Sequence, residues 1–75
     1  MKIVIIDGQG GKMGRTVIEQ LKKAFPAQEL VAIGTNSIAT SSMIKAGASL
    51  GATGENPILV ACRDADVIIG PVAIV

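Results

Sequence analysis

Residues 7–14 (DGQGGKMG) constrain the fold more than any other part of the sequence. The apolar run Ile3 to Ile6 precedes them, and an amphipathic run follows to Phe25. A strand, a glycine-rich turn and a helix in this order bring backbone amides close to a phosphate group. Glycine has no Cβ, so the oxygen atoms of a ligand can approach those amides. The segment therefore predicts a strand–turn–helix unit with a candidate phosphate site in its turn.

The spacing of the glycines, Gly8-x-x-Gly11-x-x-Gly14, is a variant of the dinucleotide-binding fingerprint. One interpretation is a cradle for a phosphate or pyrophosphate group. The other is a tight turn that needs glycine for packing alone. The candidate cofactor-binding residues lie in this turn and after the second expected strand: Gly8, Gln9, Gly10, Gly11, Lys12, Gly14, Thr35 and Asn36.

The apolar composition favours an α/β fold with a parallel sheet. Hydrophobic residues make up 49% of the 75 residues and aromatic residues 1%. Such an aliphatic core suits parallel strands that are covered on both faces. We expect strands at 3–6, 29–34 and 67–69, with helices at about 12–25 and 38–46. The prediction is one Rossmann-like domain over residues 1–75: a small three-layer parallel sheet of about three strands, with the first strand central.

The helical periodicity also predicts which side chains are buried. Those expected to face the core are Met13, Val17, Ile18, Leu21 and Phe25 in the first helix and Ile38, Met43, Ile44 and Ala46 in the second. The glycine-rich residues 47–57 are interpreted as a loop. Residues 58–62 fit either a strand or a short helix that begins at Pro57.

Charge and hydropathy limit the classes of partner. The formal net charge of +1 gives no reason to expect nucleic acid as a partner, and no apolar stretch approaches the ~20 residues of a membrane span. Cys62 is the single cysteine, which fits a reducing, cytoplasmic environment. Residues 67–75 are apolar up to the last residue. We therefore expect an N-terminal fragment of a longer chain, or a homo-oligomer that buries this segment.

The residues after the second expected strand bear on the cofactor. A site for NAD usually has an acidic residue there, which binds the ribose hydroxyls. This chain has Thr35 and Asn36 instead, and no arginine follows them to hold a 2′-phosphate. Lys12 and Arg15, on the first turn of the first helix, are the alternative cations for that role. NAD or NADP thus remains a candidate cofactor, within a broader expectation of a small phosphate-bearing ligand.

Two carboxylates are candidate catalytic residues. Asp7 lies next to the glycine turn, where it can act as a base or can accept hydrogen bonds that fix the turn. Glu55 lies in the long glycine-rich loop, and such loops often bind ligands. No histidine is present to activate Cys62, so we interpret it as an inert thiol. Without histidine or a second cysteine, no metal site is expected.

Several motifs together resemble a family of small uncharacterised bacterial proteins that is classed as a domain of unknown function. The motifs are IDGQGG at 6–11, GTN at 34–36 with AT at 39–40, GATGEN at 51–56, ADVI at 65–68 and GP at 70–71. The resemblance covers nearly the whole chain. It implies a Rossmann-like domain and a cytoplasmic protein, but no activity. Members of the family continue beyond the position of Val75.

A second similarity covers only the first strand and helix. The sequence Met13-Gly14-Arg15 is similar to the end of the glycine-rich turn in dihydrodipicolinate reductases. It implies a nicotinamide cofactor and transfers no catalytic residue. The leading hypothesis is a nucleotide- or dinucleotide-binding domain. The alternatives are a non-enzymatic assembly or regulatory protein with a purely structural glycine turn, and an enzyme that uses Asp7 and Glu55.

Overall fold

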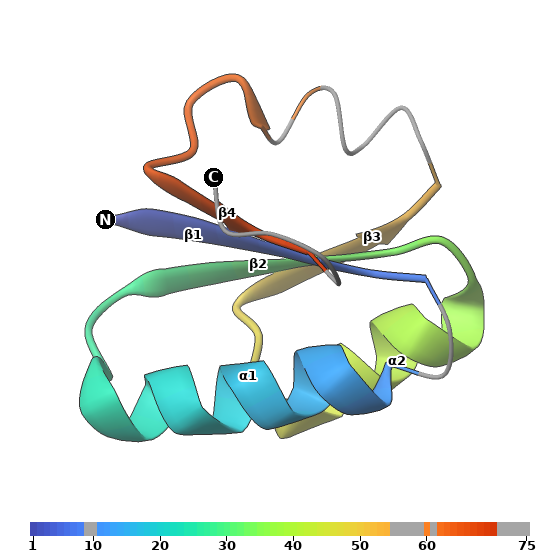
Figure 1. Ribbon diagram of the computed structural model, residues 1–75, viewed down its shortest axis with the longest axis horizontal. Coiled ribbons are helices and arrows are strands. Elements are labelled where there is room, and N and C mark those ends of the chain that lie inside the picture. Colours follow the sequence, from blue (N-terminus) through green and yellow to red (C-terminus); the bar gives the residue numbers. More distant parts are fainter. Residues whose placement is uncertain (9–10, 55–59, 61, 71–75) are drawn as a thin grey trace.

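The computed structural model describes residues 1–8, 11–54, 60 and 62–70. Strands and helices alternate along most of this length (Figure 1). The elements are β1 (Lys2–Asp7), α1 (Lys12–Ala24), β2 (Glu29–Gly34), α2 (Ser37–Ala46), β3 (Leu50–Thr53) and β4 (Val67–Ile69). None of the helices in the described ranges is long and apolar enough to cross a membrane.

The strands form one parallel sheet in the order β3-β2-β1-β4. The central pair is in register from Lys2 beside Glu29 to Asp7 beside Gly34. This confirms the predicted α/β class and the central first strand, and it is consistent with a small Rossmann-like fold. The sheet has four strands where about three were expected, because the loop interpretation is wrong for Leu50–Thr53.

Both helices cover the same face of the sheet (Figure 1). The described part of the connection from β3 to β4 lies on the opposite face, where Cys62 and Ala65 pack on the sheet. Val60 and Cys62 have helical backbone, which supports the helical alternative at those two positions. Ile58, Leu59 and Ala61 lie outside the described residues. Two full helices thus cover one face of the sheet, whereas the described cover of the other face comes from the connection between β3 and β4.

The strands carry apolar side chains on both faces, so the molecule has a core on each side of the sheet. Ile5, Ala32 and Ile18 belong to the core on the helical face. Val4, Val31 and Ile33 form the core on the other face. Near-continuous apolar runs in β1 and β2 are therefore needed, as in other parallel sheets.

The helices bury faces that differ in part from those predicted. In α1, Gly14 and Ile18 are buried, but Met13 is exposed and Phe25 lies beyond the helix with 53% of its surface exposed. In α2 the buried residues are Ala39, Thr40 and Met43, whereas Ile38 is 71% exposed and Ile44 is also exposed. α2 approaches β2 and β3 closely at Gly34 and Gly51, where Thr40 and Ile44 leave no room for a Cβ.

Candidate functional site

The carboxyl ends of β1, β2 and β3 meet at one edge of the sheet. Asp7 is beside Gly34, and Gly34 is beside Thr53. β4 pairs with β1 up to Ile69 opposite Ile5. Of the predicted site residues, Gly8, Thr35 and Asn36 are thereby brought together at the carboxyl ends of the strands, which is where open parallel sheets bind ligands.

Asp7 connects the end of β1 to the first turn of α1. Its carboxylate is buried, with 4% of the residue exposed, and Oδ2 accepts a hydrogen bond of 2.8 Å from the amide of Gly14. That amide is one of the N–H groups that a helix start leaves without an intrahelical partner. A negative charge at this end also interacts favourably with the helix dipole. This contact gives Asp7 a structural role in the turn; a catalytic role stays a prediction.

Packing explains two of the three spaced glycines. Gly11 has φ +78°, and a Cβ there would lie 2.7 Å from the carbonyl oxygen of Ala39 in α2. A Cβ on Gly14 would lie 2.5 Å from the sulfur of Met43 and 3.2 Å from the Cβ of Asp7. Glycine is therefore required at both positions so that α1 can approach α2 and β1.

Gly8 is the spaced glycine whose surroundings are most open. Among the described residues, a Cβ on Gly8 would have only the side chain of Thr35 nearby, at 3.1 Å from Oγ1. Gln9 and Gly10, which complete the predicted cradle, lie outside the described residues, as does Glu55. Packing therefore explains Gly11 and Gly14 of the glycine motif. Ligand binding at the turn remains a prediction.

Thr35 and Asn36 bind the turn that follows β1. The Thr35 hydroxyl donates to the carbonyl oxygen of Gly8 at 2.9 Å, and the Asn36 side-chain amide donates to the same oxygen at 3.1 Å. Asn36 also caps α2, because its Oδ1 accepts a hydrogen bond from the Ala39 amide at 2.9 Å. Both residues are predicted to bind a cofactor, with Asn36 near its ribose, and that role stays a prediction. The structure shows their side chains bonded to Gly8, at the start of the glycine turn.

Thr40 is the residue of this edge that sequence reasoning missed. Its buried hydroxyl lies 3.1 Å from the carbonyl oxygen of Asn36 and 2.7 Å from Oγ1 of Thr53. A Cβ on Gly34 would clash with that hydroxyl. The signal in the sequence was the glycine at the end of β2, which allows a polar side chain from α2 to reach the strand ends.

The basic residues predicted for a phosphate lie on the exposed side of α1. Lys12 is exposed at the first position of the helix, and Arg15 is exposed one turn further on. Arg15 lies 3.6 Å from Glu19 in an ion pair along the helix. Among the described residues no group of three His, Cys, Asp or Glu side chains is placed to hold a metal ion.

An ion pair lies at the opposite end of the sheet, where β1 and β4 begin. The Lys2 ammonium lies 2.5 Å from a carboxylate oxygen of Asp64. The hydrogen bond between them raises the pKa of Lys2 and lowers the pKa of Asp64. The backbone of Lys2 also exchanges hydrogen bonds with Asp66, at 2.7 Å and 2.9 Å. These contacts fix the start of β4 beside the start of β1 and are remote from the predicted site.

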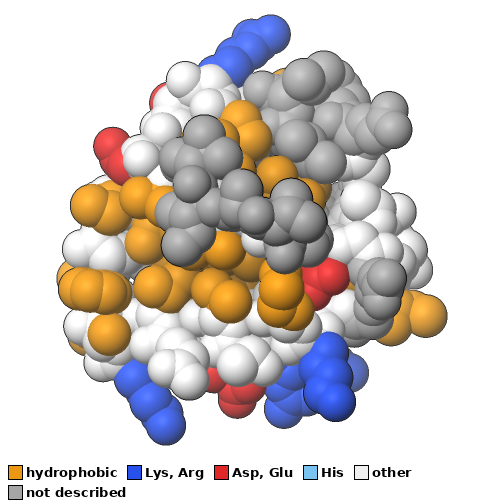
Figure 2. Space-filling view, in the orientation of Figure 1, with side chains coloured by type: hydrophobic (Ala, Val, Ile, Leu, Met, Phe, Trp, Pro, Cys, Tyr) orange, Lys and Arg blue, Asp and Glu red, His pale blue; other side chains and the backbone are white. Residues whose placement is uncertain are grey.

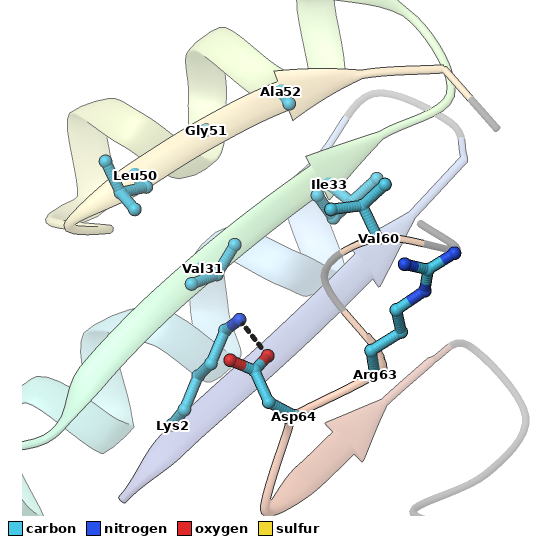
Figure 3. A pocket seen from close by; sticks show the side chains of 9 residues that line it. All are labelled: Lys2, Val31, Ile33, Leu50, Gly51, Ala52, Val60, Arg63 and Asp64. Carbon is cyan, nitrogen blue, oxygen red and sulfur yellow. Dashed lines mark hydrogen bonds and ion pairs between the residues drawn. The ribbon is translucent and has the colours of Figure 1, made fainter. Parts of the chain in front are cut away.

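An apolar hollow of about 580 Å³ lies on the face of the sheet opposite the helices (Figure 3). Val31 and Ile33 of β2 form its floor, and the described part of the β3–β4 connection lies along one side. The other lining residues are Lys2, Leu50, Gly51, Ala52, Val60, Arg63 and Asp64. Among the predicted site residues that the structure describes, none lines this hollow.

Comparison with known proteins gives one match. Residues 2–75 match the model of a family described as a domain of unknown function, DUF3842. No curated protein and no solved structure matches the chain. The match confirms the resemblance to an uncharacterised domain.

Proposed function

Because the chain belongs to the DUF3842 family, whose function is unknown, we propose a function from its geometry: the domain binds a nucleotide or dinucleotide at the carboxyl edge of the sheet. In this proposal the phosphate or pyrophosphate lies over the turn between β1 and α1. NAD and NADP are the candidate cofactors in this proposal.

The observation that carries the proposal is the reversal of strand order at β1. From β1 the chain moves to β2 and then β3 through helices on one face, and the described part of the connection to β4 lies on the other face. The connections on the two sides of β1 therefore diverge to opposite faces of the sheet. In doubly wound folds with the order 3-2-1-4, this divergence creates the crevice that binds dinucleotides. In this proposal the ligand lies at the corresponding place, beside Asp7 and Gly8.

The first turn of α1 supplies hydrogen-bond donors for a phosphate. The amides of Lys12 and Met13 have no intrahelical partner at this end, and the positive end of the helix dipole lies beside them. The amide of Gly14 already donates to Asp7, so in this proposal the ligand contacts the preceding amides, those of Lys12 and Met13. The side chain of Lys12 is exposed here and adds a positive charge.

Titration of the isotope-labelled protein with NAD(H), NADP(H), ADP and ATP tests the proposal. We expect saturable NMR shifts of the amides of Gly8, Lys12 and Met13. Lys12→Gln should weaken binding by about tenfold, the effect of ~1.4 kcal/mol. Lys23→Gln, in the last turn of the same helix, is the matched control and should leave affinity unchanged. The proposal fails if no compound shifts these amides at millimolar concentration.

A second candidate function, assembly with another copy, is favoured by the sheet edge at β4. Among the described strands β4 has a neighbour on one side only, and Val67 and Ile69 are partly exposed. Figure 2 shows hydrophobic side chains gathered between the sheet and α1. Val17 and Leu21 of α1 pack against the core on the helical face and are partly exposed. An open apolar edge is a site for strand pairing between chains.

Light scattering coupled to size-exclusion chromatography tests this second candidate. Assembly through β4 predicts a stable oligomer that Ile69→Lys converts to a monomer. Leu50→Lys, at the other edge of the sheet, is the control that should leave the oligomer intact. A wild-type monomer at all accessible concentrations would exclude assembly as the function.

A further inference from the structure

A polar groove of about 440 Å³ lies between α1 and α2 on the helical side of the molecule. It is separate from the apolar hollow, which lies on the opposite face of the sheet. Its lining residues are Arg15, Ser37, Ile38, Ser41, Ser42 and Lys45. All six belong to the described part of the two helices.

The groove is positively charged. Arg15 contributes a guanidinium from α1, and Lys45 contributes an ammonium from the last turn of α2. α2 contains no acidic residue. The pair between Arg15 and Glu19 is long, at 3.6 Å, and more than half of each side chain is exposed. Such a pair is weak, so a stronger anion can compete for the guanidinium.

Three serine hydroxyls in the groove are available to a ligand. Within the described residues, Ser37, Ser41 and Ser42 make no side-chain hydrogen bond. The threonines of the same helices behave differently: the hydroxyls of Thr16 and Thr40 bond to backbone oxygens one turn earlier, at 3.0 Å and 3.1 Å. Serines that do not bond back to their own helix can donate to a bound group.

We propose that this groove binds a phosphate monoester group. Two cations with several hydroxyl donors match the charge and the acceptor oxygens of a phosphate dianion better than those of a singly charged carboxylate. The groove begins beside the glycine turn, because a Cβ on Gly11 would lie 2.9 Å from the Cβ of Ser42. A ligand whose pyrophosphate lies over the turn can therefore place a second phosphate here. In that respect the inference rests on the proposed function, and it favours NADP(H) over NAD(H).

NMR titration with inorganic phosphate, at constant ionic strength, tests the groove itself. We expect saturable shifts of the amides of Ser37, Ser41, Ser42 and Lys45. The double variant Arg15→Gln/Lys45→Gln should weaken phosphate binding at least about tenfold, the effect of ~1.4 kcal/mol. Lys23→Gln/Arg63→Gln removes the same charges from exposed positions outside the groove and should have no effect. Absent shifts, or equal weakening in both double variants, would overturn the proposal.

Titration with NADP⁺ and NAD⁺ then identifies the source of the phosphate. If it is the 2′-phosphate of a dinucleotide, NADP⁺ binds about tenfold more tightly than NAD⁺, and Arg15→Gln/Lys45→Gln abolishes the difference. If phosphate binds the groove while neither dinucleotide shifts the amides of Gly8 and Lys12, the groove is supported for a free phosphate compound and the proposed function fails. If NADP⁺ and NAD⁺ bind equally and phosphate does not bind, the groove proposal fails and the proposed function stands.

Discussion

At the scale of single residues, Asp7 shows how one side chain serves both the strand and the helix of the first unit. Its buried carboxylate accepts the amide of Gly14, and its backbone oxygen accepts the amide of Thr35 at 3.1 Å. The first contact joins β1 to α1, and the second joins β1 to the end of β2. An acidic residue next to a predicted phosphate site is thereby explained without a catalytic step.

Replacement of Asp7 by alanine should destabilise the domain by about 2 kcal/mol, the typical loss when a buried hydrogen-bonding partner is removed. Asp7→Asn retains a side-chain oxygen that can accept the Gly14 amide and should lose less. Urea unfolding of both variants measures the difference. If Asp7→Ala is as stable as the wild type, the carboxylate does not stabilise the turn.

The packing of Gly11 predicts a large difference between two glycine substitutions. Gly11→Ala should destabilise the fold by at least about 1–2 kcal/mol from the left-handed backbone alone, and contact with Ala39 adds to this. Gly70→Ala is the control, since none of the described residues lies within 4 Å of a Cβ there. Thermal unfolding compares the two. Equal melting temperatures would show that α1 and α2 are not in close contact at Gly11.

At the scale of elements, β3 shows where the sequence signal was insufficient. Leu50 to Thr53 contains glycine and alanine, which have low strand propensity, and a glycine-rich stretch surrounds it. The strand forms because it pairs with β2 from Val31 to Gly34. Gly51 is small because Ile44 of α2 would clash with a Cβ there. Tertiary pairing and helix packing therefore determine this strand, and neither is visible in local periodicity.

The ion pair at the start of β1 predicts a dependence of stability on pH. Pairing with Lys2 lowers the pKa of Asp64. The contribution of Asp64 to the stability of the fold is therefore complete above its ordinary pKa of about 3.8, and it is lost as the pH falls through the lowered pKa. Pairing raises the pKa of Lys2, so that contribution is present below its ordinary value of 10.5 and is lost as pH rises through the raised one.

Asp64→Asn should therefore lower the melting temperature slightly near neutral pH and should reduce the loss of stability on acidification below about pH 4. The effect is small because the Asp64 side chain is 76% exposed. Melting curves of wild type and variant across the acid range measure it. Parallel pH profiles for the two proteins would show that the pair does not contribute.

At the scale of the whole molecule, the sheet order predicts where the fold is most resistant to opening. β1 and β2 are central and carry most of the fully buried side chains, whereas β3 and β4 are at the edges. Amide hydrogen exchange should be slowest in Val4, Ile5 and Ala32 and faster in both edge strands. Exchange in β4 as slow as in β1 would indicate that another chain segment covers that edge.

The general architecture was predictable because the apolar runs of β1 and β2 and the periodicity of α1 are strong local signals. The order of β1, β2 and β4 followed from parallel pairing with short connections. The burial of α2 was not predictable from hydropathy, since Ile38 is exposed and Thr40 is buried. The contacts of Thr35 and Asn36 with Gly8 depend on the distance between two loops, which only the folded sheet determines.

The pairing of β4 with β1 has a consequence for synthesis on the ribosome. The contact between Lys2 and Asp66 joins positions 64 residues apart, so one side of β1 has no partner until nearly the whole described chain has been made. At ordinary rates of translation, the interval between completing β3 and completing β4 lasts roughly one to three seconds. During that time the nascent domain presents an unpaired apolar strand, which a chaperone or a neighbouring nascent chain can bind.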